Sequence, residues 1–127
     1  MDKSLEPKEW LKRALSNLNL GKSLAKGVNF EDLCFNFQQS VEKALKAILI
    51  KNKINVPRTH SISELINLLK SNSINIPDEL EKTAPSLHIY AVDTRYPDNY
   101  FLVDEDDYKE ALEIAQKVYN WAKTIIN

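Results

Sequence analysis

The 127-residue sequence contains one cysteine and two glycines, and each scarcity excludes a class of function. A single cysteine, Cys34, cannot form a disulfide within the chain, and its place among apolar residues predicts a small buried side chain rather than a nucleophile or a metal ligand. Gly21 and Gly27 are too few for the glycine-rich loops that hold phosphates in P-loop and dinucleotide-binding proteins. If the protein binds a nucleotide, its side chains must supply the contacts.

The sequence also lacks a long apolar run and an excess of either charge. No segment approaches the ~18 apolar residues of a membrane-spanning helix, and the polar start has no signal-peptide core, so we expect a soluble cytoplasmic protein. With 17 basic and 18 acidic residues the net charge is −1, so any contact with nucleic acid must be local. His60 and His88 have no second ligand at helical spacing, and we therefore expect neither a metal site nor a cofactor.

Apolar residues recur every three or four positions along most of the chain. This period predicts an all-α fold, an up-and-down bundle of four to five helices that forms a single domain over residues 1–127. The first two helices are expected over residues 7–26 and 30–51. A fourth is expected from about residue 77 to about residue 92, with a bend at Pro85.

Two polar segments predict where the remaining helices begin. Ser61 and Glu64 have the spacing of a capping box, in which each side chain accepts a hydrogen bond from a backbone N–H of the other residue, so a third helix should open there. Asp104 is a suitable N-cap for the last helix, and the acidic residues after it favour the positive end of the helix dipole. This acidic run is therefore expected to start a helix rather than to bind a metal.

The helix expected over residues 30–51 carries a polar stripe beside its apolar face. At ~100° per residue, Gln38 lies about 80° and Glu42 about 120° from the centre of that face, so both border the core, with Phe35 beside them. Two other polar residues of the stripe, Gln39 and Lys43, point further outward. An ordinary solvated helix face, stabilised slightly by the pair Glu42–Lys46, is the alternative interpretation of these charges.

The last helix has two apolar stripes, and one of them needs a further partner. The second stripe consists of Ile114, Val118, Trp121 and Ile125. Either this helix is central in the bundle, or its second stripe meets another chain. Since small helical bundles commonly associate, we expect a homodimer.

Two loop segments, residues 57–60 and 94–98, concentrate Arg, His and Tyr, as recognition loops often do. The guanidinium of Arg95 either pairs with Glu42 or binds a phosphate. Tyr96 is able to stack on a nucleobase or on a partner protein. The ring of His60 either has a structural role, in which it hydrogen-bonds a helix end or simply packs, or takes part in a binding site.

In their order and spacing these segments resemble the HEPN family. The resemblance rests on a first helix that contains Trp10, on residues 34–47, on the segment from Pro57 to Ile62, and on Thr94-Arg95-Tyr96-Pro97. It implies an all-α bundle that is commonly a homodimer. It also implies a partner, because such proteins are often encoded beside a minimal nucleotidyltransferase and form a toxin–antitoxin-like two-component system with it.

Many HEPN proteins are metal-independent ribonucleases that use an Arg and a His separated by four to six residues. This sequence lacks that motif, since only Thr59 separates Arg58 from His60 and no histidine follows Arg95. The resemblance therefore favours a binding module without catalytic residues over an enzyme.

The residues expected to bind a nucleotide or a partner are Gln38, Gln39, Glu42, Lys43, His60, Arg95 and Tyr96. Those expected to form the dimer or partner interface are Phe35, Ile114, Trp121 and Ile125. One alternative is a ribonuclease with an unconventional site built from His60 and either Arg58 or Arg95. Another is a structural adaptor that buries Phe35, Trp121 and the loop aromatics against another protein.

Overall fold

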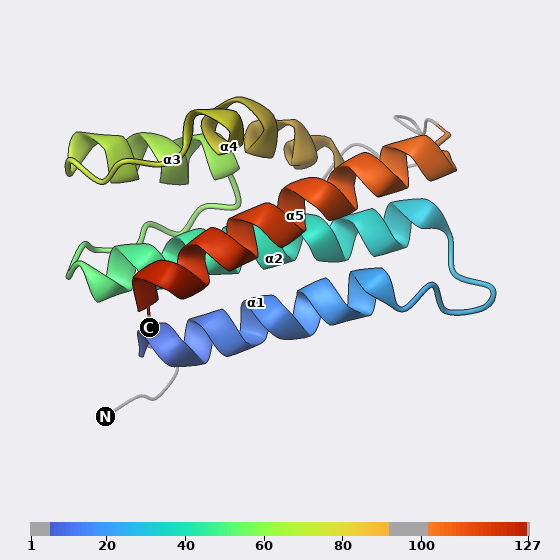
Figure 1. Cartoon of the computed structure of the whole chain (residues 1–127), viewed down its shortest axis with the longest axis horizontal. Helices are drawn as coiled ribbons and strands as arrows, with labels where there is room; N and C mark the ends of the chain where they lie inside the picture. The colour runs from blue at the N-terminus through green and yellow to red at the C-terminus, as the bar shows by residue number, and fades with distance from the viewer. Residues whose placement is uncertain (1–5, 92–101, 127) are drawn as a thin grey trace.

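Three long helices run the length of the molecule. The computed structural model describes residues 6–91 and 102–126. Helices α1 (Pro7–Lys22), α2 (Phe30–Lys51) and α5 (Glu105–Ile126) lie along one another, and the start of α1 and the end of α5 lie at the same end of the bundle (Figure 1). α2 is central, since it packs against α1, α5 and two of the shorter elements. The prediction of an all-α up-and-down bundle is confirmed.

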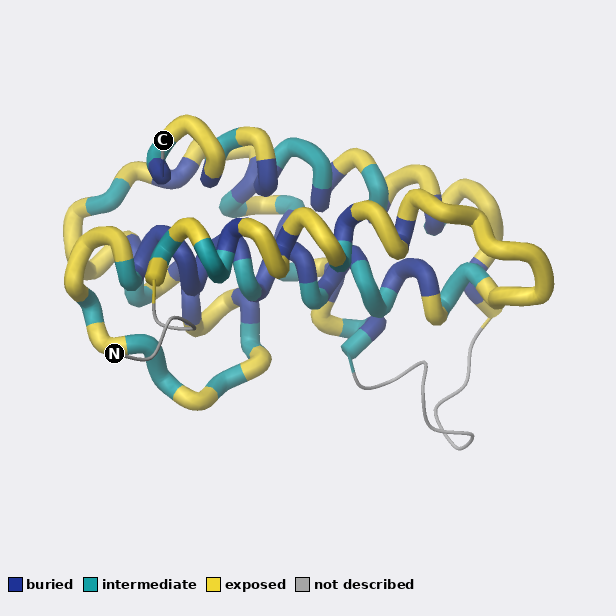
Figure 2. Tube along the Cα trace, turned by 90° about the horizontal axis from the view of Figure 1, so that it is seen from below, coloured by how far each residue is buried: buried dark blue, intermediate teal, exposed yellow. Residues whose placement is uncertain are grey.

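Shorter elements cover the side of α2 and α5 that faces away from α1. These are α3 (Ile62–Ser71), α4 (Asp78–Thr83) and a 3₁₀ segment, η2 (Ala84–Tyr90) (Figure 1). Figure 2 shows the buried turns gathered where the helices face one another and the exposed turns on the outside. Among the described helices, none combines the length and the apolar character that a membrane-spanning helix requires.

The predicted helix boundaries agree with the structure except at α1 and after α4. The bounds of α2 are those expected, but α1 ends at Lys22 instead of residue 26, because Leu24 adopts a positive φ of 47° and breaks the helical backbone. The bend expected at Pro85 is a change from α-helix to 3₁₀-helix after Thr83. A proline has no N–H with which to continue the α-helical hydrogen bonds.

The start of α3 has the predicted serine cap but not the whole capping box. The hydroxyl of Ser61 accepts a hydrogen bond from the backbone N–H of Glu64 at 3.2 Å. The backbone N–H of Ser61 donates to Oγ1 of Thr59 at 3.0 Å, so a threonine takes the place expected for the Glu64 carboxylate. α3 therefore begins where the sequence predicts, with its N-terminus tied to the preceding loop.

The start of α5 has both reciprocal hydrogen bonds. The backbone N–H of Asp107 donates to Oδ1 of Asp104 at 2.9 Å, and the backbone N–H of Asp104 donates to Oδ2 of Asp107 at 3.1 Å. The role predicted for the acidic run as a helix start is confirmed.

Gly21 lets α1 approach the other two long helices closely. A Cβ added to Gly21 would lie 2.3 Å from Cε1 of Phe37, a fully buried ring of α2. The hydroxyl of Tyr108 in α5 donates to the carbonyl of Gly21 at 2.8 Å, and its ring centroid is 5.4 Å from that of Phe37. Only a glycine fits at this contact without displacing the ring.

The predicted burial of Cys34 is confirmed, because its side chain is fully enclosed in the core. Burial, with a smaller contribution from the negative charge of Asp107, raises the pKa of the Cys34 thiol to about 12, although a hydrogen bond with Tyr90 opposes the shift. The thiol is therefore protonated at neutral pH and behaves as a small core side chain.

Candidate functional site

A buried carboxylate lies at the centre of the polar stripe on α2. Glu42 is 3% exposed, and its Oε1 lies 2.8 Å from Nδ1 of His60 while its Oε2 lies 3.8 Å from Nζ of Lys46. The side chain of His60, by contrast, is 79% exposed. An ionised carboxylate only accepts hydrogen bonds, so Nδ1 of His60 carries the proton in this contact and Nε2 is left for another partner.

Two glutamines of α2 bind the backbone of His60, one directly and one through the other. Gln38 is fully buried, and its Nε2 donates to the backbone carbonyl of His60 at 3.3 Å. Nε2 of Gln39 donates in turn to Oε1 of Gln38 at 2.7 Å. Because both the ring and the backbone of His60 are bound to α2, the loop between α2 and α3 has a fixed position on this helix.

Lys46 lies between Glu42 and an aromatic ring of α1. Its side chain is 11% exposed, and its Nζ lies 5.9 Å from the ring centroid of Trp10, within the range of a cation–π contact. The indole Nε1 of Trp10 is buried and has no hydrogen-bond acceptor within the described part of the chain. An unpaired buried N–H is unusual and marks a place where a water or a ligand atom would be favourable.

Lys43 continues the polar stripe towards α1. Its Nζ donates to Oδ1 of Asn17 at 2.7 Å, and Nδ2 of Asn17 donates to Oδ1 of Asn36 at 3.0 Å. Burial lowers the pKa of Lys43, the negative charge of Glu42 opposes this shift, and the positive charges of Arg13 and Lys46 add to it. Cations from two helices therefore lie close enough to Lys43 to disfavour its own charge.

Most of the predicted binding residues thus lie in one place. Gln38, Gln39, Glu42, Lys43 and His60, which we call the α2 polar cluster, are joined by these hydrogen bonds or charge contacts. Arg95 and Tyr96, which were predicted to join them, lie outside the described residues.

Two interpretations of these residues need correction. The stripe is not a solvated helix face, because Glu42 and Lys46 are buried under Trp10 and the loop before α3. His60 neither packs in the core nor bonds a helix end, because its exposed ring meets the carboxylate of Glu42. The pairing of Arg95 with Glu42 stays a prediction, because Arg95 lies outside the described residues.

Sequence reasoning missed the contributions of Trp10, Asn17 and Lys46. The spacing of Glu42 and Lys46 was noticed, but only as a weak surface pair. Trp10 was noted only as part of the family resemblance and Asn17 was not noted, since their contacts with α2 follow from the packing of the two helices and not from any local pattern.

The residues predicted for a dimer or partner interface differ in exposure. Trp121 and Ile125 are half-buried and lie one turn apart on α5, and Phe35 is half-buried on α2. Ile114 is only 5% exposed, because it packs within the chain. Burial of Ile114 and Val118 shows that the bundle itself accounts for the first half of the second apolar stripe.

A comparison with protein families matches residues 7–125 to the HEPN domain. The chain belongs to the HEPN family. It is 31% identical to "Putative toxin MJ1304" of Methanocaldococcus jannaschii, over 94% of this chain and 87% of that protein.

Two solved structures share the fold of this HEPN protein. TT1696 from Thermus thermophilus superposes with a TM-score of 0.82 at 28% identity, over 94% of this chain and 97% of that one. ST0689, described as an archaeal HEPN homologue, superposes with a TM-score of 0.76 at 30% identity, over 96% and 98%. The resemblance inferred from sequence segments is thus confirmed at the level of family and fold.

Proposed function

We propose that this HEPN protein is the toxin-like member of a two-component pair and that its α2 polar cluster binds a nucleotide or the end of an RNA. The observation that carries the proposal is the buried carboxylate of Glu42, which holds the exposed ring of His60 at 2.8 Å. The name of the relative from Methanocaldococcus jannaschii supports the toxin-like role.

The energetic cost of the cluster argues that it serves a purpose other than stability. Removing a carboxylate and an ammonium group from water costs several kcal/mol, and replacement of such a pair by apolar residues often leaves a protein equally stable. In this chain the pair Glu42–Lys46 stands beside an exposed histidine whose Nε2 is not used by the contact with Glu42. Such an arrangement is typical of a site that receives a ligand.

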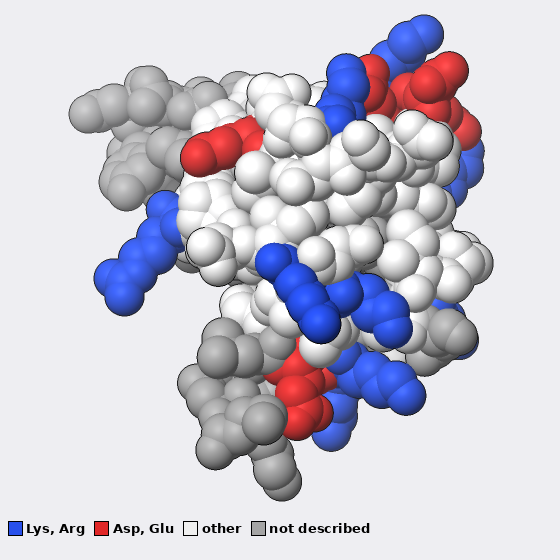
Figure 3. All heavy atoms as spheres, turned by 90° about the vertical axis from the view of Figure 1, so that its left-hand side faces the viewer, with Lys and Arg blue, Asp and Glu red and all other residues white. Residues whose placement is uncertain are grey.

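The local charge is suited to a phosphate even though the net charge of the chain is −1. Lys43 lies within electrostatic reach of Arg13 and Lys46, and an anion placed among them would restore the favourable charge of Lys43. His60 lies on the other side of Glu42 and adds a proton donor when its ring is charged. Figure 3 shows Lys and Arg side chains projecting from one end of the bundle, with acidic side chains beside several of them.

Trp10 provides a fluorescent reporter next to the α2 polar cluster, because it contacts Lys46, the ion-pair partner of Glu42. In a Trp121→Phe variant, Trp10 is the remaining tryptophan of the chain. We expect its fluorescence to change with nucleotide concentration to a saturating value, and we expect the change to disappear when His60 is also replaced by Ala. Exposed Lys109, at the other end of α5, provides the control variant Lys109→Ala. A titration that is flat, or that is the same with and without His60, would overturn the proposed site.

The second part of the proposal concerns association. A homodimer and a complex with a minimal nucleotidyltransferase are both proposed to use Trp121, Ile125 and Phe35, with Ile114 contributing from beneath because it is buried. Gel filtration of the chain alone and mixed with a minimal nucleotidyltransferase from the same genome tests both. Elution of the chain alone as a monomer would contradict the homodimer. Elution of the chain and the nucleotidyltransferase in separate peaks would contradict the two-component role. Neither result bears on the ligand site.

A metal-independent ribonuclease is the second candidate function, and the contact of Glu42 with His60 favours it. A carboxylate at Nδ1 fixes the ring so that Nε2 is free to take or give a proton, as in enzymes that use a histidine as acid and base. Arg58 is exposed two residues before His60 and would supply a positive charge. If this function holds, RNA cleavage in the presence of a chelator should be lost in His60→Ala. Cleavage that persists in this variant would exclude His60 as the catalytic acid and base.

A further inference from the structure

A surface pocket is formed by the loop that leads to His60 and by α3, and no residue of the α2 polar cluster lines it. It has a volume of about 560 Å³, within the range of small-molecule sites, and is an open groove between the loop before α3 and the outer face of α3. Its lining residues come from both segments: Asn55, Val56 and Pro57 from the loop, and Glu64, Asn67 and Leu68 from α3. We call it the α3 pocket.

The lining of the α3 pocket is suited to a flat, neutral ring that carries N–H groups. Val56, Pro57 and Leu68 provide apolar surface, and the amides of Asn55 and Asn67 provide both donors and acceptors. The carboxylate of Glu64 is an acceptor only. Among the described residues that line the pocket none is Lys, Arg or His, so a phosphate has no counter-charge here.

The positive groups lie directly next to the pocket along the chain. Pro57 lines the pocket, Arg58 follows it with an exposed side chain, and His60 is the exposed member of the α2 polar cluster. The backbone N–H of Thr59 donates to the carbonyl of Pro57 at 2.9 Å, which folds this segment tightly. The three residues from Pro57 to His60 span at most ~11 Å when fully extended, so the pocket and His60 are close enough for one nucleotide to reach both.

We propose that the α3 pocket binds the base of the nucleotide whose phosphate end lies at His60, the member of the α2 polar cluster nearest to this pocket along the chain. The inference rests on the proposed function for the phosphate end and adds the class of base. An adenine is favoured, because an Asn amide pairs with its amino group and ring nitrogen, and a carboxylate accepts from the same amino group. Guanine and uracil present a carbonyl oxygen where adenine has its amino group, and this oxygen would face the carboxylate of Glu64.

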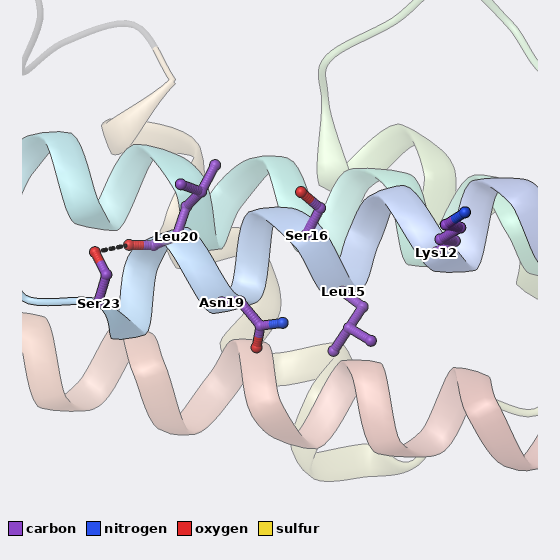
Figure 4. A pocket seen from close by; sticks show the side chains of 6 residues that line it. All are labelled: Lys12, Leu15, Ser16, Asn19, Leu20 and Ser23. Carbon is purple, nitrogen blue, oxygen red and sulfur yellow. Dashed lines mark hydrogen bonds between the residues drawn. The ribbon is translucent and has the colours of Figure 1, made fainter.

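A second surface pocket lacks these properties. It has a volume of about 420 Å³ and lies on the outer face of α1 (Figure 4). Its lining side chains come from one helix and its C-terminal end, and in the close-up they diverge, with Leu15 and Asn19 on one side and Leu20 on the other. No second segment provides groups that converge on a ligand in this pocket. We therefore expect it to bind no nucleotide, and a substitution in its lining serves as the control.

Calorimetric titration with adenosine monophosphate, inosine monophosphate, adenosine and pyrophosphate tests the proposal. Adenosine monophosphate should bind about tenfold more tightly than inosine monophosphate, since a well-formed amide–base pair contributes about 1–3 kcal/mol of discrimination. Asn67→Ala and Glu64→Gln should abolish this preference and leave pyrophosphate binding unchanged. Both residues are exposed, so these variants should fold, and Asn19→Ala in the α1 pocket should bind like the wild type.

The four ligands separate the failure of this inference from the failure of the proposed function. Equal affinities for adenosine and inosine monophosphate, unaffected by Asn67→Ala, would overturn the base pocket and leave a phosphate site at His60 intact. Binding of adenosine but not of pyrophosphate would support the pocket and refute the phosphate site. If neither adenosine nor adenosine monophosphate binds, the base pocket is refuted.

Discussion

Replacement of Glu42 by Ala tests whether this carboxylate, at the centre of the α2 polar cluster, forms a desolvated ion pair with Lys46. The variant leaves Lys46, 11% exposed, without its carboxylate and leaves His60 without its partner at Nδ1. Loss of one member of a buried pair typically costs about 3–5 kcal/mol. Since the ring of His60 opens one side of the cluster to water, we expect a loss near the lower end, about 3 kcal/mol, from a total stability of about 5–15 kcal/mol.

Urea unfolding followed by circular dichroism measures this loss, with an unchanged m-value showing that the folded and unfolded states remain comparable. The double variant Glu42→Leu, Lys46→Met removes both charges and should recover most of the loss, because an apolar pair of similar volume carries no desolvation cost. The matched control is Lys109→Ala, which breaks the exposed pair Glu105–Lys109 at the same spacing and should cost less than about 1 kcal/mol. If Glu42→Ala costs no more than Lys109→Ala, the carboxylate is solvated and the reasoning fails.

Three further predictions concern the fold around the site. Gly21→Ala should lower the free energy of unfolding by about 1–3 kcal/mol, because the new Cβ would overlap the ring of Phe37. Helix propensity alone predicts the opposite, a gain of about 1 kcal/mol. Thermal unfolding distinguishes the two, since the first predicts a lower Tm and the second a higher Tm. Cys34 should resist alkylation at pH 8 until the chain is unfolded, and rapid alkylation of the folded protein would contradict its burial. Since burial raises the pKa of the Cys34 thiol from 9.0 to about 12, its contribution to the free energy of unfolding should be full below pH 9 and decline from pH 9 to 12. Asp104→Ala should cost about 1 kcal/mol by removing the N-cap of α5, and an unchanged midpoint in urea would show that the cap is not formed.

Local sequence patterns were sufficient for most of the fold. The bounds of α2 followed from its apolar period, and the starts of α3 and α5 followed from Ser61 and Asp104, because a cap is a contact between residues three apart. The end of α1 was misjudged because Leu24 adopts a conformation that a glycine usually takes.

The candidate site was predicted in its members but not in its arrangement. The helical period placed Gln38 and Glu42 at the border of the core. Both contact His60, about twenty residues later, and no local pattern records how distant segments pack. The contact of His60 with Glu42 is of the same kind, since it joins residues 18 apart.

Thermal unfolding with a panel of nucleotides tests the central claim most directly, because any ligand of the native state raises its apparent stability. At a concentration about 100-fold above Kd the gain is about 2.7 kcal/mol, which corresponds to a rise of several degrees in Tm for a chain of this size. The account predicts this rise for the wild type and its loss in His60→Ala. A Tm that no nucleotide changes, or a rise that survives in His60→Ala, would contradict it.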